Sequence, residues 1–210
     1  MSRSMSTSTS TSMSTVATMR APRDGRLPGI MFMAIVSFAW ATNALIGGAL
    51  ELVGIAAMAL AGGLVVAFAI LTRRMRTAEI EVPVAPTADT GRGPALMRSR
   101  GFVIACLAEV VGFMLVIATL GRIDPALVMP GIALVVALHF ILIHRAFGGG
   151  IHLVMTAVGS VVALAGIAAI LAGVDADLVR ALVGLGMGAI TLTYGWLFAG
   201  TLAREYPSHR

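Results

Sequence analysis

Residues 28–71, "PGIMFMAIVSFAWATNALIGGALELVGIAAMALAGGLVVAFAIL", decide how this chain folds, because the run is almost wholly apolar. As one α-helix it would extend about 66 Å, more than twice the ~30 Å hydrocarbon thickness of a bilayer. The chain must therefore turn back inside this run. The turn belongs at "GGALE", where Gly47 and Gly48 loosen a helix and Glu51 seeks water. The predicted spans are 28–47 and 51–71.

The composition also indicates that the chain folds in a lipid bilayer. Hydrophobic residues make up 58% of the chain and charged residues only 12%, whereas a soluble domain carries about a quarter charged residues. A globule in water has no means of hiding so much apolar surface. Helices are required, since a lipid-exposed strand edge would leave backbone groups unpaired. The sequence predicts an all-α, polytopic transmembrane helix bundle.

Four further apolar runs follow a polar stretch, and the turns between them mix Gly or Pro with charge: "GRIDP", "HRAFGGGI" and "GVDADL". They give six spans in all. A cleaved signal peptide ending at Ala44 is the alternative for the first span, but a leader of nearly 30 residues before it is too long. The added spans are 101–121, 125–144, 151–173 and 178–200.

The polar segments divide the chain into five parts. The first is rich in Ser, Thr and Met and has little to bury, so we expect disorder there. The prolines and charges between the second and third spans predict a flexible cytoplasmic linker. The sequence leaves open whether translation starts at Met1, Met13 or Met19. The expected parts are tail 1–27, transmembrane hairpin 28–71, linker 72–100, four-helix transmembrane unit 101–203 and tail 204–210.

Arginine placement predicts the orientation. All 15 basic residues are arginine, and they lie at the ends of apolar runs rather than in a patch with interleaved aromatics, so we expect no nucleic-acid partner. Cytoplasmic loops carry the excess of positive charge. With both termini in the cytoplasm, 13 arginines lie inside and Arg122 and Arg180 outside. The inside set is Arg3, Arg20, Arg23, Arg26, Arg73, Arg74, Arg76, Arg92, Arg98, Arg100, Arg145, Arg204 and Arg210.

Two ionisable residues lie deep in predicted spans. Glu109, in "CLAEVVGF", follows Arg100 by nine residues and so lies about 13 Å into the membrane. His139, in "VVALHFILIHR", precedes Arg145 by six residues and lies about 9 Å in from the same side. Their helices are joined by a short turn, so we expect antiparallel neighbours and a Glu109–His139 pair.

The pair has two interpretations, which the sequence leaves open. A buried ionisable group is costly in hydrocarbon and often marks a proton relay or a solute site. A hydrogen-bonded carboxyl and imidazole also offset part of that cost by sharing a proton, and then only fix helix packing. Tyr194, about 15 Å deep on the last span, is the candidate accessory residue.

Milder polar residues and the glycines indicate packing. Trp40, Asn43, Thr191 and Thr193 are predicted to be structural, through bonds to the backbone or between helices. Small residues at regular spacing mark faces for close helix contact. We therefore expect the fifth and sixth spans to pack on the faces of Gly159, Gly166, Gly173, Gly184 and Gly188.

The chain lacks recognisable cofactor and catalytic motifs. "GLGMG" has no lysine and no preceding strand, so it is not a phosphate loop. Cys106 is the only cysteine, which excludes an intrachain disulfide and a cysteine cluster for metal. His144 and His152 match no zinc spacing and are predicted to be interfacial. We expect no metal, no cofactor and no enzymatic activity.

Two resemblances rest on these segments. "LAEVVG" resembles the membrane-embedded glutamate segment of small multidrug resistance transporters, which implies a proton- and cation-binding role for Glu109, although those proteins have four helices with the glutamate in the first. Residues 100–200, with "PALVMPGIALVVALHFILIHRAF", resemble uncharacterised bacterial six-helix integral membrane proteins that carry a Gly-Leu-His-Phe segment. Ala137 stands here where that glycine would be. This resemblance implies a membrane protein and no activity.

The sequence therefore predicts a multi-pass protein of the cytoplasmic (inner) cell membrane. The first hypothesis is a non-enzymatic membrane module that packs against or regulates partner proteins. The alternative is a small-solute or proton-coupled permease that uses Glu109 and His139. The lipid bilayer is the expected surrounding partner, and the sequence leaves open a protein partner or a homo-oligomer and any small-molecule substrate.

Overall fold

A computed structural model of the chain describes residues 17–20, 26–45, 50–77, 79–82 and 100–205. Within these residues, six helices are long and apolar enough to cross a membrane. The helical architecture and the number of membrane-length helices are as predicted. The helices are α1 (Arg26–Ala41, continued by the 3₁₀ turn η1, Thr42–Leu45), α2 (Glu51–Thr77), α4 (Arg100–Ile123), α5 (Val128–Phe147, preceded by the 3₁₀ turn η2, Pro125–Leu127), α6 (Gly150–Leu171) and α7 (Ala176–Glu205).

The turns between the last four helices follow from their polar and glycine residues. The Asp124 carboxylate accepts a hydrogen bond of 2.9 Å from the Ala126 N–H, and Asp175 accepts one of 2.9 Å from Leu178 N–H. Each caps a helical start whose N–H groups lack partners within the helix. Gly148 and Gly149 have φ values of 72° and 88°, which a residue with a Cβ adopts rarely. Gly47 and Gly48, the predicted turn of the first hairpin, lie outside the described residues.

A short two-stranded ribbon lies outside the six helices. Strand β1 (Ala17–Arg20) pairs antiparallel with β2 (Glu79–Val82), with Ala17 opposite Val82. This pairing differs from the disorder expected for the tail and the linker. The sequence "EIEV" alternates charged and β-branched residues, which is the pattern of a strand. Residues 26–27 of the expected tail belong to α1, and residues 72–77 and 100 of the expected linker belong to α2 and α4. The other residues of both segments lie outside the described residues.

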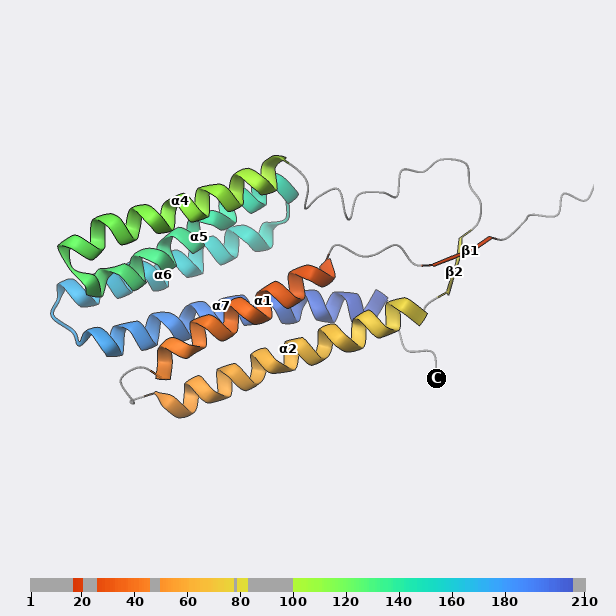
Figure 1. Cartoon of the computed structure of the whole chain (residues 1–210), viewed down its shortest axis with the longest axis horizontal. Coiled ribbons are helices and arrows are strands. Elements are labelled where there is room, and N and C mark those ends of the chain that lie inside the picture. Colours follow the sequence, from red (N-terminus) through yellow and green to blue (C-terminus); the bar gives the residue numbers. More distant parts are fainter. Residues whose placement is uncertain (1–16, 21–25, 46–49, 78, 83–99, 206–210) are drawn as a thin grey trace, which may run out of the picture.

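The helices form two groups that meet at α7 (Figure 1). In one group α4 packs on α5, and α5 packs on α6. In the other, α1 lies between α2 and α7, and α2 also contacts α7. Because α7 packs against α1 more extensively than against α6, it does not simply complete a four-helix unit with the three helices before it. The expected boundary between 28–71 and 101–203 therefore differs from the observed packing.

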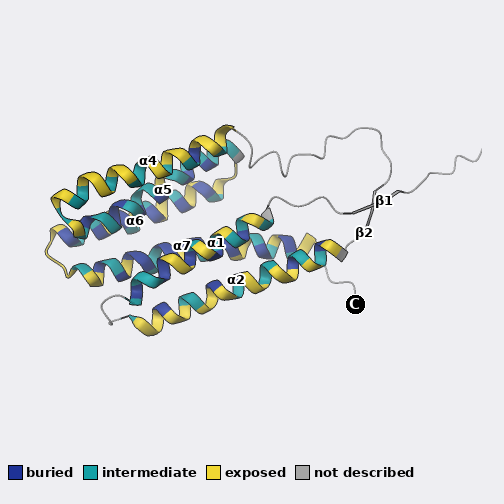
Figure 2. Cartoon of the chain, in the orientation of Figure 1, coloured by how far each residue is buried: buried dark blue, intermediate teal, exposed yellow. Residues whose placement is uncertain are grey.

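The core follows this arrangement. One buried cluster centres on Phe140, Met155, Met187 and Tyr194, where α5, α6 and α7 meet, and it includes Trp40 of α1. A second cluster joins α1, α2 and α7. Figure 2 shows that α2 and α4 expose much of their surface, and the side chain of Ile104 on α4 is 60% exposed. Apolar residues that face outward over the length of a span suit contact with lipid.

Candidate intramembrane polar site

Glu109 and His139 lie side by side on α4 and α5. The His139 Nδ1 atom is 3.1 Å from the Ala105 carbonyl oxygen and 3.9 Å from the Glu109 Oε2 atom. The side chains are 13% exposed for His139 and 21% exposed for Glu109. The two residues predicted to pair are therefore neighbours, and both are largely shielded within spans that are otherwise apolar.

The contact with Ala105 shows which ring nitrogen of His139 donates a hydrogen bond. A carbonyl oxygen only accepts hydrogen bonds, so Nδ1 carries the proton that is donated to Ala105. Ala105 and Glu109 are one helical turn apart and lie on the same face of α4. One N–H group therefore lies against both acceptors: the hydrogen bond goes to the backbone, and the carboxyl, at 3.9 Å, contributes an electrostatic contact.

Close packing between α4 and α5 brings the two groups together. A Cβ added at Gly112 would lie 2.6 Å from Val135 Cγ1, and one added at Gly131 would lie 2.7 Å from Leu120 Cδ1 and 2.9 Å from Val116 Cγ1. Both glycines let the helices approach more closely than larger residues would. Sequence reasoning missed them, because each stands alone in an apolar run without a spacing that marks a face.

Tyr194 is not part of this pair, which corrects its predicted accessory role. Its hydroxyl lies 2.9 Å from the His152 Nδ1 atom. The Phe140 ring contacts both sites, with its centre 6.3 Å from that of His139, 6.5 Å from that of His152 and 5.8 Å from that of Tyr194. Counting residues along α7 gives a predicted depth, but depth does not say which neighbouring helix a side chain faces.

His152, which is predicted to be interfacial, has a buried side chain, at 7% exposure, that is hydrogen-bonded to Tyr194. It stands in the first turn of α6, where Phe140 and Tyr194 cover it. His144 differs: its Nδ1 lies 3.0 Å from the Gly149 carbonyl oxygen in an exposed turn. The sequence feature that indicates burial of His152 is the presence of aromatic residues on the adjacent spans.

The milder polar residues make local bonds. The Thr191 hydroxyl lies 3.0 Å from the Met187 carbonyl oxygen and 2.8 Å from the Ser37 hydroxyl. Because Thr191 has one proton to donate, and its own helix accepts it, the Ser37 hydroxyl donates to Thr191. Sequence reasoning missed Ser37. The Asn43 side-chain amide donates to carbonyl oxygens at the end of α1, at 3.2 Å from both Ala39 and Trp40.

The glycines divide between two interfaces. A Cβ at Gly159 would lie 2.9 Å from Ala137 Cβ, and one at Gly166 would lie 2.5 Å from Val183 Cγ2, so these two sit at close contacts of α6 with α5 and α7. Gly184 and Gly188 face α1 instead, near Trp40 and Asn43, which corrects the predicted contact with the fifth span.

Gly173 has no packing role. It lies past the end of α6 with a φ of 80°, and nothing stands within 4 Å of an added Cβ. The prediction that it lies on a packing face is therefore wrong. Gly173 is needed to end the helix, and its seven-residue spacing from Gly166 is coincidental.

Within the described residues, no group of three His, Cys, Asp or Glu side chains is placed to hold a metal ion. No protein-family model matches the chain, and no curated protein or solved structure shows significant similarity to it. The resemblances to six-helix bacterial proteins and to small multidrug resistance transporters stay predictions, and the geometry of the polar groups carries the functional argument.

Proposed function

We propose that this chain is a non-enzymatic, multi-pass module of the cytoplasmic membrane, in which Glu109 and His139 lock α4 onto the rest of the bundle. The observation that supports this best is the bond from His139 Nδ1 to the Ala105 carbonyl oxygen. A side chain that is bonded to the backbone of its neighbouring helix holds one relative position of the two helices. That is the role of a structural contact.

The position of α4 adds support. Among the described helices it packs mainly on α5, and most of its large apolar side chains point outward. In lipid the hydrophobic effect does not drive one apolar helix onto another, so close packing and polar contacts hold them together. The Glu109–His139 contact and the close approaches at Gly112 and Gly131 supply both.

The second polar pair argues for a module over a proton-conducting path. Among the described residues no hydrogen bond joins the His139 site to the His152–Tyr194 pair, and the Phe140 ring contacts both histidines. A phenyl ring has no exchangeable proton and no hydrogen-bonding atom, so this contact does not pass a proton. The two sites therefore act as separate helix contacts within the described structure.

We place the arginine-rich end of the bundle in the cytoplasm, together with both termini. Arg74 and Arg76 are in the last turn of α2, and Arg204 is in the last turn of α7, while Arg100 begins α4. Glu51, Asp124 and Asp175 lie at the other ends of these helices or in the turns there. The positive-inside rule supports this orientation.

The permease hypothesis has one observation in its favour: Glu109 keeps 21% of its side chain exposed. A test uses the full chain in liposomes that contain a pH-sensitive dye, with a pH gradient imposed across the membrane. We expect no proton flux above that of empty liposomes, and no difference between wild type and Glu109→Gln. Glu51→Gln, at an exposed helix start, is the matched control. Flux that Glu109→Gln abolishes and Glu51→Gln preserves would establish the permease instead.

A further inference from the structure

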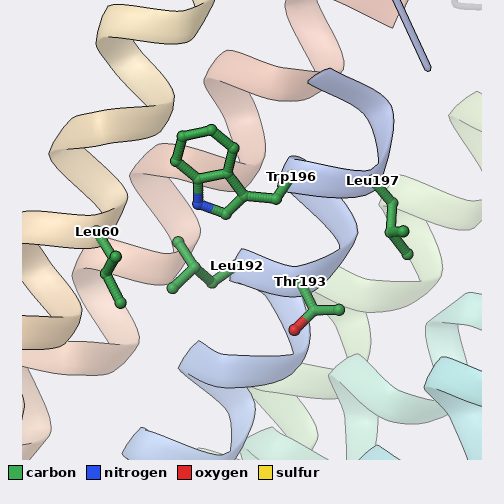
Figure 3. A pocket seen from close by; sticks show the side chains of 5 residues that line it. All are labelled: Leu60, Leu192, Thr193, Trp196 and Leu197. Atoms are coloured by element: carbon green, nitrogen blue, oxygen red, sulfur yellow. The ribbon is translucent and has the colours of Figure 1, made fainter. Parts of the chain in front are cut away.

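A groove of about 340 Å³ opens on the side of the bundle between α2 and α7. Leu60 of α2 and Leu192, Thr193, Trp196 and Leu197 of α7 line it (Figure 3). The three leucine side chains are wholly apolar, and the Trp196 side chain is mainly apolar. Both helices are membrane-length, so the groove opens toward the region that lipid tails occupy.

A small residue on α2 shapes this groove. A Cβ added at Gly63 would lie 3.2 Å from the Trp196 Cζ2 atom, so the indole ring lies over this glycine. The Trp196 side chain remains 41% exposed. One step further along, a Cβ at Gly195 would lie 2.6 Å from Leu64 Cδ1, where α2 and α7 touch. Leu64 and Gly195 thus set the register of the two helices.

That register places arginines at one end of the groove. Arg74 is eleven residues beyond Gly63, and Arg204 is eleven residues beyond Thr193. Eleven residues are close to three full turns, so each arginine lies on the groove-lining face of its helix, about 16 Å toward the helix end. Half of a ~30 Å hydrocarbon core is about 15 Å. The arginines therefore stand at the depth of phosphate groups when the groove stands at mid-membrane.

The charge at this end selects the ligand. Among the described residues, the ends of α2 and α7 carry four guanidinium groups and the Glu205 carboxylate, and Glu79 and Glu81 follow α2 in strand β2. An anionic lipid headgroup is attracted by about 1 kcal/mol for each basic residue near the membrane surface, and a guanidinium matches phosphate oxygens through paired N–H donors. The four basic residues are Arg73, Arg74, Arg76 and Arg204.

We propose that the α2–α7 groove binds one anionic phospholipid from the leaflet at the arginine end, with an acyl chain beside Leu60 and Trp196 and its phosphate at Arg74 and Arg204. The site goes beyond the proposed function, because it involves neither Glu109 nor α4. A lipid bound at this site differs from the lipid around the rest of the bundle in two ways. It has a preferred headgroup, and its binding depends on α2 and α7.

The test uses the full chain in detergent, titrated with phosphatidylglycerol or phosphatidylcholine, with bound lipid counted by native mass spectrometry. We expect one phosphatidylglycerol to be retained in preference to phosphatidylcholine. Arg204→Gln should weaken phosphatidylglycerol binding about fivefold, which corresponds to one basic residue near the surface. Arg122→Gln, at the opposite end, should leave it unchanged.

Filling the groove provides the second arm. Leu60→Trp should remove the retained lipid, whereas Leu115→Trp, at a similarly exposed position on α4, should not; Leu60 is 54% exposed and Leu115 is 59% exposed. Thermal unfolding of each variant checks that it is folded. Equal retention of both headgroups, or a folded Leu60→Trp that retains lipid like Leu115→Trp, would overturn the proposal. If Leu60→Trp does not fold, the arginine variants decide it alone.

Discussion

His139 gives one N–H group to α4, and two acceptors on α4 compete for it. The Ala105 carbonyl oxygen is at hydrogen-bonding distance, 3.1 Å, and the Glu109 carboxyl oxygen is at 3.9 Å. The consequences of losing each residue are therefore unequal. Without Glu109, the imidazole keeps its backbone partner. Without His139, the carboxyl loses its contact with the imidazole and is left in a largely apolar helix.

A double-mutant cycle tests this inequality. His139→Leu should lower the free energy of unfolding in micelles more than Glu109→Leu does. The double variant should be more stable than the sum of the two losses predicts, with a coupling of about 0.6–2 kcal/mol. Glu109→Leu combined with His152→Leu is the control, and its effects should add because His152 is hydrogen-bonded to Tyr194 and Glu109 contacts His139. Additive losses for Glu109 and His139 would mean that the two side chains do not interact.

At the residue scale, the sequence predicted the Glu109–His139 pair but not the hydrogen bond that His139 makes. Counting residues from Arg100 and Arg145 gives depth, and a short turn gives antiparallel neighbours, so Glu109 and His139 were placed together. Depth does not give the direction of a side chain around its helix. For that reason Tyr194 was assigned to the wrong histidine, and the Ala105 carbonyl oxygen was not foreseen as the acceptor.

At the scale of elements, α7 is held by its glycines. Gly184 allows α1 to approach so closely that an added Cβ would lie 2.7 Å from both the Trp40 carbonyl oxygen and the Asn43 Cβ. One of these atoms belongs to the backbone, which has little freedom to move aside. Gly200, on the same helix, has nothing within 4 Å of an added Cβ.

Alanine substitution separates these two glycines. Gly184→Ala should destabilise the protein by about 1–3 kcal/mol, because the added methyl group overpacks the α1–α7 contact. Gly200→Ala should be neutral or stabilising by up to about 1 kcal/mol, since alanine favours a helix over glycine. Thermal or denaturant unfolding in the same detergent gives both values. Equal effects at the two positions would show that α1 does not pack on Gly184.

The helices themselves follow from the sequence, while their partners do not. Apolar runs bounded by charge and by glycine or proline set the ends of each span, and α5 and α6 differ from prediction by only a few residues. Small-residue spacing correctly marked a contact face at Gly184 and Gly188. The same spacing carries no information about which helix covers that face, so α6 was expected where α1 is found.

At the scale of the whole molecule, charge is divided between the two ends of the bundle. The start of α4 and the ends of α2, α5 and α7 lie at the same end of the bundle (Figure 1). They carry Arg100, Arg74, Arg145 and Arg204. The opposite end has acidic residues beside Arg122 and Arg180. The end that faces the cytoplasm determines on which side the termini lie. It also determines the side of the membrane nearest to Glu109 and the leaflet of the proposed lipid.

Cysteine accessibility in intact cells tests the orientation and the predicted crossing of α4, α5 and α6 between the linker and the α6–α7 turn. In a Cys106→Ala background, Val174→Cys lies in the exposed turn between α6 and α7, at the acidic end, and Ala88→Cys lies in the predicted cytoplasmic linker. We predict that a membrane-impermeant maleimide labels Val174→Cys in intact cells and labels Ala88→Cys only after the membrane is permeabilised. Labelling of Ala88→Cys in intact cells, with Val174→Cys protected, would contradict the orientation and everything that depends on it.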